Sequence, residues 1–106
     1  MKILIVDDDK NYLLSLYEGL SSHYEDHEIL TAENGKIAVE KLENNDIGLV
    51  VTDLKMPQMD GFSLLSYISR NYSTIPVIGV TAFGTPEIKH ELLSTGMFLL
   101  LEKPIA

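Results

Sequence analysis

The chain has 106 residues, 45% of them hydrophobic, which is enough for one compact domain with an adequate core and too short for a second domain. Sixteen acidic residues against eight basic ones give a net charge of −8, which argues against direct binding to nucleic acid or to an anionic membrane. The chain has no cysteine, which excludes disulfides and thiolate metal sites. We therefore expect proteins, cations or small molecules as partners.

The first apolar run is too short to be a targeting signal. Residues 2–6 are fewer than a signal-peptide core needs, and three aspartates follow them directly. No later stretch reaches the about 18 apolar residues of a membrane span. We expect a cytoplasmic protein.

Apolar runs alternate with helical repeats along the chain. Residues 3–6 are rich in β-branched side chains and stop at the aspartates, which is typical of a strand buried on both faces. A helix over about residues 11–22 follows, because one face repeats at helical spacing: Leu13, Leu16, Tyr17 and Leu20. The same patterns predict strands at residues 28–32, 47–52, 76–80 and 97–101, and helices at 36–43, around 64–72 and between 85 and 96.

This strict alternation predicts an α/β fold. Short connections between strands and helices favour a parallel sheet with helices on both faces and right-handed crossovers. We expect a doubly wound sheet of five strands in the order 2-1-3-4-5, which brings the ends of every strand but the second to one crevice.

Chemically distinctive residues stand at these strand ends. They are Asp7 and Asp8, Asp53, Thr81 and Lys103. Carboxylates about 4 Å apart repel by roughly 4 kcal/mol at an effective dielectric constant near 20, so such a cluster is tolerable mainly when a cation or a proton neutralises it. Oxygen ligands of this kind match Mg²⁺, which keeps part of its hydration shell and often binds phosphate oxygens.

A lysine and a hydroxyl beside such a metal would complete a phosphoryl-binding site, because both stabilise the charge on the phosphoryl oxygens. The chain offers no cysteine, and no serine and histidine are paired at a strand end, so the nucleophile must be a carboxylate. Asp53 is the candidate, because it alone follows the central strand.

Taken together, these motifs resemble those of response regulator receiver domains, the CheY-like family. The motifs are Asp7-Asp8, Asp53, the loop Lys55-Met56-Pro57-Gln58-Met59-Asp60-Gly61, Thr81-Ala82 and Lys103-Pro104. Each is weak alone, but five in the right order over residues 2–105 are highly specific. The resemblance implies a flavodoxin-like, CheY-like fold.

The resemblance also implies a two-component signalling role. Asp53 would accept a phosphoryl group from the phosphohistidine of a sensor histidine kinase or a histidine phosphotransfer protein. Mg²⁺ would be held by Asp8, Asp53 and the backbone carbonyl of Lys55, with Asp7 acting through water.

Two further roles come from the same resemblance. Thr81 would bond the phosphoryl oxygens and draw its loop inward, and Lys103 would pair with the phosphate. The aspartyl phosphate would then shift a two-state equilibrium and so control an output partner or domain. Such a protein is a regulatory phosphoacceptor rather than an enzyme, and it catalyses only its own phosphorylation and dephosphorylation.

Two other functions compete with this interpretation. A constitutive interaction module of the same fold would not need the full set of Asp8, Asp53, Thr81 and Lys103. A Mg²⁺-dependent phosphatase with an aspartyl nucleophile would normally carry a second acid two residues later, where this chain has Lys55. We interpret Asp9 as a cap of the first helix rather than as part of the site.

The sequence departs from the family pattern in three ways. Leu100 stands where many receivers carry Tyr or Phe, so movement of Thr81 alone would carry the signal. Lys55 and Phe83 should overhang the site and slow hydrolysis of the phosphoryl group. Receivers close with a fifth helix, so we expect residues 1–106 to be a truncated domain whose uncovered sheet face invites dimerisation.

Overall fold

The computed structural model describes residues 1–23, 26–53, 61–81 and 99–102. In chain order its elements are β1 (Lys2–Val6), α1 (Lys10–His23), β2 (Glu28–Ala32), α2 (Gly35–Asn44), β3 (Ile47–Asp53), α3 (Gly61–Asn71), β4 (Val77–Thr81) and β5 (Leu99–Glu102). The predicted helix between residues 85 and 96 lies outside the described residues, as do the last residues of the chain. In the part that is described, no helix is long and apolar enough to cross a membrane.

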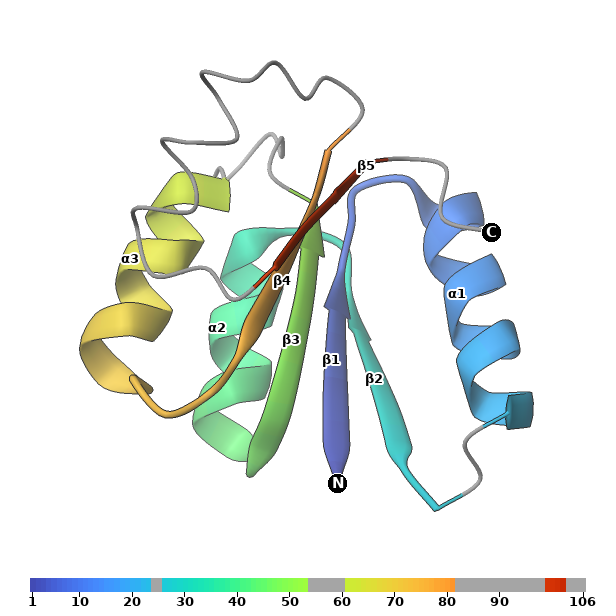
Figure 1. The fold of residues 1–106 in the computed structure, drawn as a ribbon, viewed down its shortest axis with the longest axis horizontal. Coiled ribbons are helices and arrows are strands. Elements are labelled where there is room, and N and C mark those ends of the chain that lie inside the picture. Colours follow the sequence, from blue (N-terminus) through green and yellow to red (C-terminus); the bar gives the residue numbers. More distant parts are fainter. Residues whose placement is uncertain (24–25, 54–60, 82–98, 103–106) are drawn as a thin grey trace.

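The strands form one parallel sheet in the order β2-β1-β3-β4-β5 (Figure 1). This is the order predicted from the sequence. The chain reverses its direction of winding after β2, so β1 and β3 lie side by side at the point where ligands bind in sheets of this class.

Helices cover both faces of this sheet. α1 packs on one face, and α2 and α3 pack on the other (Figure 1). β1 supplies both cores: Ile3 and Ile5 face α1, while Leu4 and Val6 belong to the core under α2 and α3. The alternation of side chains along a strand explains this division, and it confirms the prediction of a strand buried on both faces.

Each predicted strand and helix in the described part is present, with shifts of one to three residues at the ends. β3 extends to Asp53, which pairs with Val80 of β4. β4 begins at Val77 rather than at Pro76, because proline has no N–H to give to the sheet. The carbonyl of Pro76 still accepts a hydrogen bond from the N–H of Val50 at 3.1 Å.

One expected core residue of α1 is wrong. Leu13 is buried in the core under α1, and Leu16 and Leu20 pack against that core, but Tyr17 is 41% exposed. The helix turns by about 100° per residue, which places Tyr17 at the margin of the apolar stripe. There it lines an open hollow of about 340 Å³ between α1 and the edge strand β2.

Candidate functional site

Three carboxylates meet at the carboxyl end of the sheet. Asp7 directly follows β1, Asp8 comes next, and Asp53 is the last residue of β3. β1 and β3 are neighbours, and Val6 pairs with Thr52, so the two strands end at the same level. One oxygen from each of the three carboxylates lies within 4.8 Å of the others.

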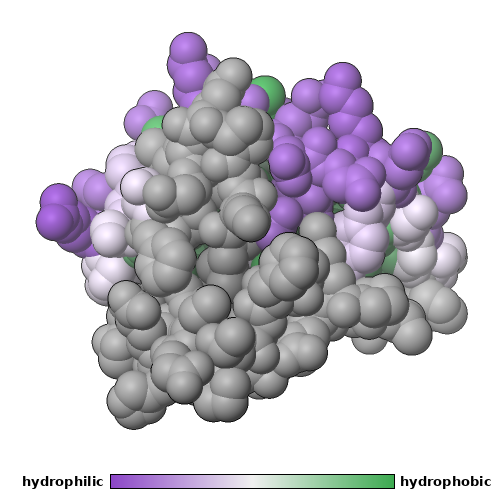
Figure 2. Space-filling view, turned by 90° about the horizontal axis from the view of Figure 1, so that it is seen from above, coloured by the Kyte–Doolittle hydropathy of each residue, from purple (hydrophilic) through white to green (hydrophobic). Residues whose placement is uncertain are grey.

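The three residues differ in their exposure. Asp7 is 2% exposed and Asp53 is 7% exposed, while Asp8 is open to solvent. Part of the described surface at this end of the molecule is strongly hydrophilic (Figure 2). The cluster therefore has a buried base and an open side through which a small ligand can enter.

Hydrogen bonds fix the main chain around Asp7. Its N–H donates to the carbonyl of Ala32 at the end of β2, over 3.1 Å. Its Oδ1 accepts a hydrogen bond from the N–H of Asp9 at 2.9 Å. This second contact is an Asx turn, in which an aspartate side chain binds the backbone two residues later.

A buried hydroxyl supports the end of β3. Thr52 has no exposed surface, and its Oγ1 donates to the carbonyl of Asp53 over 2.9 Å. Asp53 is thus the end of a strand held by pairing to both neighbours, with β1 on one side and β4 on the other. Its position is set by the sheet rather than by a loop.

The donor set suits a hard divalent cation. All three ligands are carboxylate oxygens, which Mg²⁺ and Ca²⁺ prefer, and their separation permits contact with one ion. Like charges this close repel each other in a partly buried site, so a cation would stabilise the arrangement.

The other predicted site residues are only partly covered by the structure. Thr81 ends β4 directly after Val80, the partner of Asp53, but its side chain is outside the described part. Lys103 follows Glu102, which pairs with Thr81, and Lys103 itself lies outside the described residues. The same holds for Lys55 and Phe83.

Asp9 has a contact that the sequence interpretation missed. Its predicted role as a helix cap is confirmed, since its Oδ1 accepts from the N–H groups of Asn11 and Tyr12 at 3.0 and 3.2 Å. Its N–H also binds the carboxylate of Asp7. The spacing of Asp7 and Asp9, two apart and just before a helix, is the signal that could have indicated an Asx turn.

A comparison with protein families decides the assignment of the fold. The family model for the response regulator receiver domain matches residues 3–106. The chain belongs to the response regulator receiver family. Receivers are regulatory phosphoacceptors of two-component systems, and the family binds Mg²⁺ at acidic residues of the kind that cluster here.

Named relatives agree with this family. The chain is 39% identical over 105 residues to the sensor histidine kinase RcsC of Escherichia coli K12, and 35% identical over 103 residues to the transcriptional regulatory protein GlrR of the same strain. These matches cover 99% and 97% of the receiver chain but only 11% and 23% of the two relatives. The chain thus spans no more than about a quarter of these relatives.

A solved structure shares the fold. The chemotaxis protein CheY4 of Vibrio cholerae superposes on the receiver with a TM-score of 0.91 at 27% sequence identity. The match covers 99% of this chain and 88% of CheY4. The receiver therefore has the CheY-like α/β fold with a parallel sheet that the sequence predicted.

Proposed function

We propose that Asp53 is the phosphoacceptor of this receiver. The observation that carries the proposal is the position of Asp53 at the end of a central strand, with the carboxylates of Asp7 and Asp8 within 4.8 Å. In the reaction, a carboxylate oxygen of Asp53 forms a bond to phosphorus as the bond from phosphorus to the donor nitrogen breaks. The imidazole of the donor histidine keeps the electron pair of that bond.

Asp7, Asp8, Asp53 and the backbone carbonyl of Lys55 would hold Mg²⁺ beside the acceptor. When bound, the ion supplies positive charge that offsets the charge of the phosphoryl oxygens. Asp53 is buried, so water competes little for its oxygens, while the exposed Asp8 leaves the site open to a donor. Asp7 would act mainly through a water molecule.

Thr81 and Lys103 would complete the site from β4 and β5. Thr81 would donate its hydroxyl to a phosphoryl oxygen, and Lys103 would pair with the phosphate. The strand register supports this proposal. Asp53 of β3 pairs with Val80, the residue before Thr81, and Thr81 pairs with Glu102, the residue before Lys103. Asp53, Thr81 and Glu102 therefore lie at the same end of three neighbouring strands. Phosphorylation would shift a pre-existing equilibrium between two conformations.

The partners follow from this chemistry. A sensor histidine kinase or a histidine phosphotransfer protein would supply the phosphoryl group, and a partner protein or domain would respond to the switch. The names of two relatives, a sensor histidine kinase and a transcriptional regulatory protein, support both kinds of partner. Dimerisation through an uncovered sheet face and a cytoplasmic location stay predictions from the sequence.

Exposure to a small phosphoryl donor tests the proposal. We expect acetyl phosphate with Mg²⁺ to add one phosphoryl group to the wild-type chain, measured by mass, and beryllofluoride with Mg²⁺ to shift the amide resonances near Asp53. Asp53→Asn should show neither change. Asp46→Asn, at an exposed position in the turn between α2 and β3, is the matched control and should behave as wild type. Phosphorylation that persists in Asp53→Asn would contradict the proposal.

A further inference from the structure

Two successive hydrogen-bond motifs connect the carboxylate cluster to α1. In the first, the carboxylate of Asp7 accepts from the N–H of Asp9 at 2.9 Å. In the second, the carboxylate of Asp9 accepts from the N–H groups of Asn11 and Tyr12 at 3.0 and 3.2 Å. The residue that orients one member of the cluster is therefore the residue that caps the helix.

The backbone of Asp9 is also hydrogen-bonded to the helix. Its carbonyl accepts the first intrahelical hydrogen bond, from the N–H of Leu13 over 2.9 Å. Both the side chain and the carbonyl of Asp9 are thus fixed by the first turn of α1, which is the full geometry of an N-cap residue. The direction of its N–H, and with it the hydrogen bond to Asp7, depends on that turn.

Asp8 lies between two fixed points. On one side, the N–H of Asp7 is bonded to Ala32, and on the other side Asp9 is bonded to α1. A change in the first turn of α1 would move the peptide between Asp8 and Asp9. It would therefore disturb two of the three carboxylates that lie within 4.8 Å of one another.

We propose that Asp9 is a positioning residue for the cation site. By capping α1 it holds the N–H that orients the Asp7 carboxylate, so that cation affinity and formation of the first helical turn are linked. The inference rests on the proposed function, because it takes Asp8 and Asp53 as direct cation ligands and Asp7 as a group that holds the cation through water. Asp9 itself is not a ligand in this scheme.

The linkage works in both directions. A cation that needs the Asp7 carboxylate in its present orientation binds best when α1 is capped, and by reciprocity it stabilises the capped turn. Loss of an N-cap lowers the equilibrium constant for helix formation by a factor of about two to thirty, and typically about five. We therefore expect loss of the cap at Asp9 to weaken Mg²⁺ binding by about two- to fivefold.

Two neutral variants separate capping from charge. Asp9→Ser and Asp9→Ala both remove the negative charge, but only serine keeps a side-chain oxygen that can cap the helix. Mg²⁺ affinity would be measured by amide chemical-shift titration at constant ionic strength. We expect Asp9→Ala to bind Mg²⁺ about two- to fivefold more weakly than Asp9→Ser. Mg²⁺ should also slow hydrogen exchange at Asn11 and Tyr12 in wild type and Asp9→Ser, and much less in Asp9→Ala.

Asn34→Ala is the control for general loss of stability. Asn34 caps α2, a different helix, since its Oδ1 accepts from the N–H of Ile37 at 2.8 Å. This variant should lose helix stability and keep the Mg²⁺ affinity of wild type. A loss of affinity equal to that of Asp9→Ala would overturn the inference.

The remaining outcomes are also distinguishable. Equal Mg²⁺ affinities for Asp9→Ser and Asp9→Ala would overturn the linkage and leave Asp9 as a simple cap. If the wild-type chain shows no saturable Mg²⁺ shift at the amides of Asp7, Asp8 and Asp53, the proposed cation site itself fails, and the linkage fails with it.

Discussion

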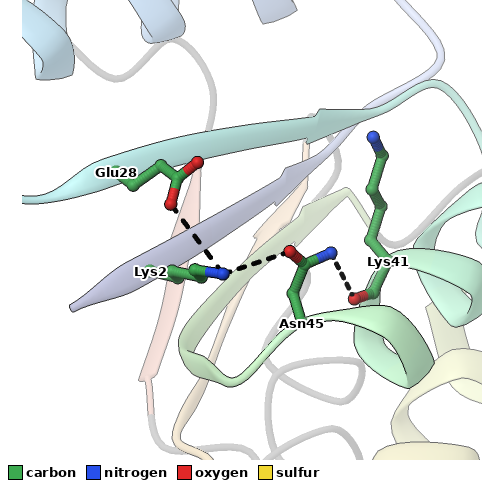
Figure 3. Close-up of polar contacts among 4 residues, drawn as sticks. All are labelled: Lys2, Glu28, Lys41 and Asn45. Atoms are coloured by element: carbon green, nitrogen blue, oxygen red, sulfur yellow. Dashed lines mark hydrogen bonds and ion pairs between the residues drawn. The ribbon is translucent and has the colours of Figure 1, made fainter.

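The two ends of the sheet differ in how their charged side chains are arranged. At the amino end, Lys2 of β1 lies 3.9 Å from the carboxylate of Glu28 and donates to the side-chain oxygen of Asn45 at 3.2 Å (Figure 3). Asn45 in turn donates to the carbonyl of Lys41 over 3.0 Å, at the end of α2. At the carboxyl end, the same strand leads into two of three carboxylates that lie within 4.8 Å of one another.

This difference separates what holds the fold from what serves the site. The contacts of Lys2 join β1 to β2 and to the turn after α2, and they match each charge with an acceptor or an opposite charge. At the carboxyl end, three like charges lie close together, and their mutual repulsion opposes folding until a cation binds. Removing a charge should therefore have opposite effects on stability at the two ends.

The largest effect is expected at Asp53. In metal-free buffer, Asp53→Asn should raise the free energy of unfolding by about 1 to 2 kcal/mol, because it relieves repulsion from Asp7 and Asp8 that solvent around the exposed Asp8 screens only in part. Added Mg²⁺ should raise the free energy of unfolding of wild type, because a cation that binds only the folded state stabilises it. The same addition should stabilise the variant much less, because the variant lacks one of the carboxylates. Urea unfolding with and without Mg²⁺ measures both effects.

Asp46→Asn provides the comparison for this experiment. It removes one negative charge at an exposed position, so its unfolding free energy should stay within about 0.5 kcal/mol of wild type with or without Mg²⁺. If Asp53→Asn is less stable than wild type in metal-free buffer, repulsion is not the dominant interaction at the carboxyl end.

A smaller effect of opposite sign is expected at Lys2. Lys2→Met keeps most of the apolar stem but removes the ion pair with Glu28 and the hydrogen bond to Asn45, so it should lower stability by about 0.5 kcal/mol. Lys10→Met is the matched variant, because it breaks an exposed ion pair with Glu33 at 3.7 Å. Urea midpoints at low salt should fall more for Lys2→Met, and equal midpoints would remove the distinction.

The sequence predicted most of the sheet because its signals are local. The strand predicted at residues 28–32 is confirmed as β2, with the same first and last residues. Its end is easy to locate in the sequence, because Asn34 caps the next helix and Gly35 begins it. The position of Asp53 at the end of a buried strand could be predicted from the same kind of local signal. The exposure of Tyr17 could not be predicted, because the neighbouring strand decides how far a residue at the margin of a helix face is buried.

The site was predictable only as a set of residue types at strand ends. Parallel strands bring their carboxyl ends together, so the meeting of Asp7, Asp8 and Asp53 followed from topology. The hydrogen bond from the N–H of Asp9 to Asp7 did not, because it depends on the orientation of a single peptide group. The spacing of Asp7 and Asp9 permits an Asx turn, but spacing alone does not show that the turn forms.

The smallest effect is expected at Tyr67 of α3, whose hydroxyl donates to Glu43 of α2 at 3.3 Å. Burial, followed by the neighbouring Tyr72 and Glu43, raises the pKa of Tyr67 from 10.0 to about 12. The phenol ionises at lower pH in the unfolded chain than in the folded one. Its contribution to stability is therefore complete below pH 10 and is lost as the pH rises through 12.

Tyr67→Phe should cost less than about 0.5 kcal/mol near neutral pH. Above pH 10, its urea midpoint should rise relative to that of wild type, because only wild type loses this contribution. Tyr17→Phe, at an exposed tyrosine, controls for loss of a phenol, and an equal gain in both variants would argue against a special role for the contact with Glu43.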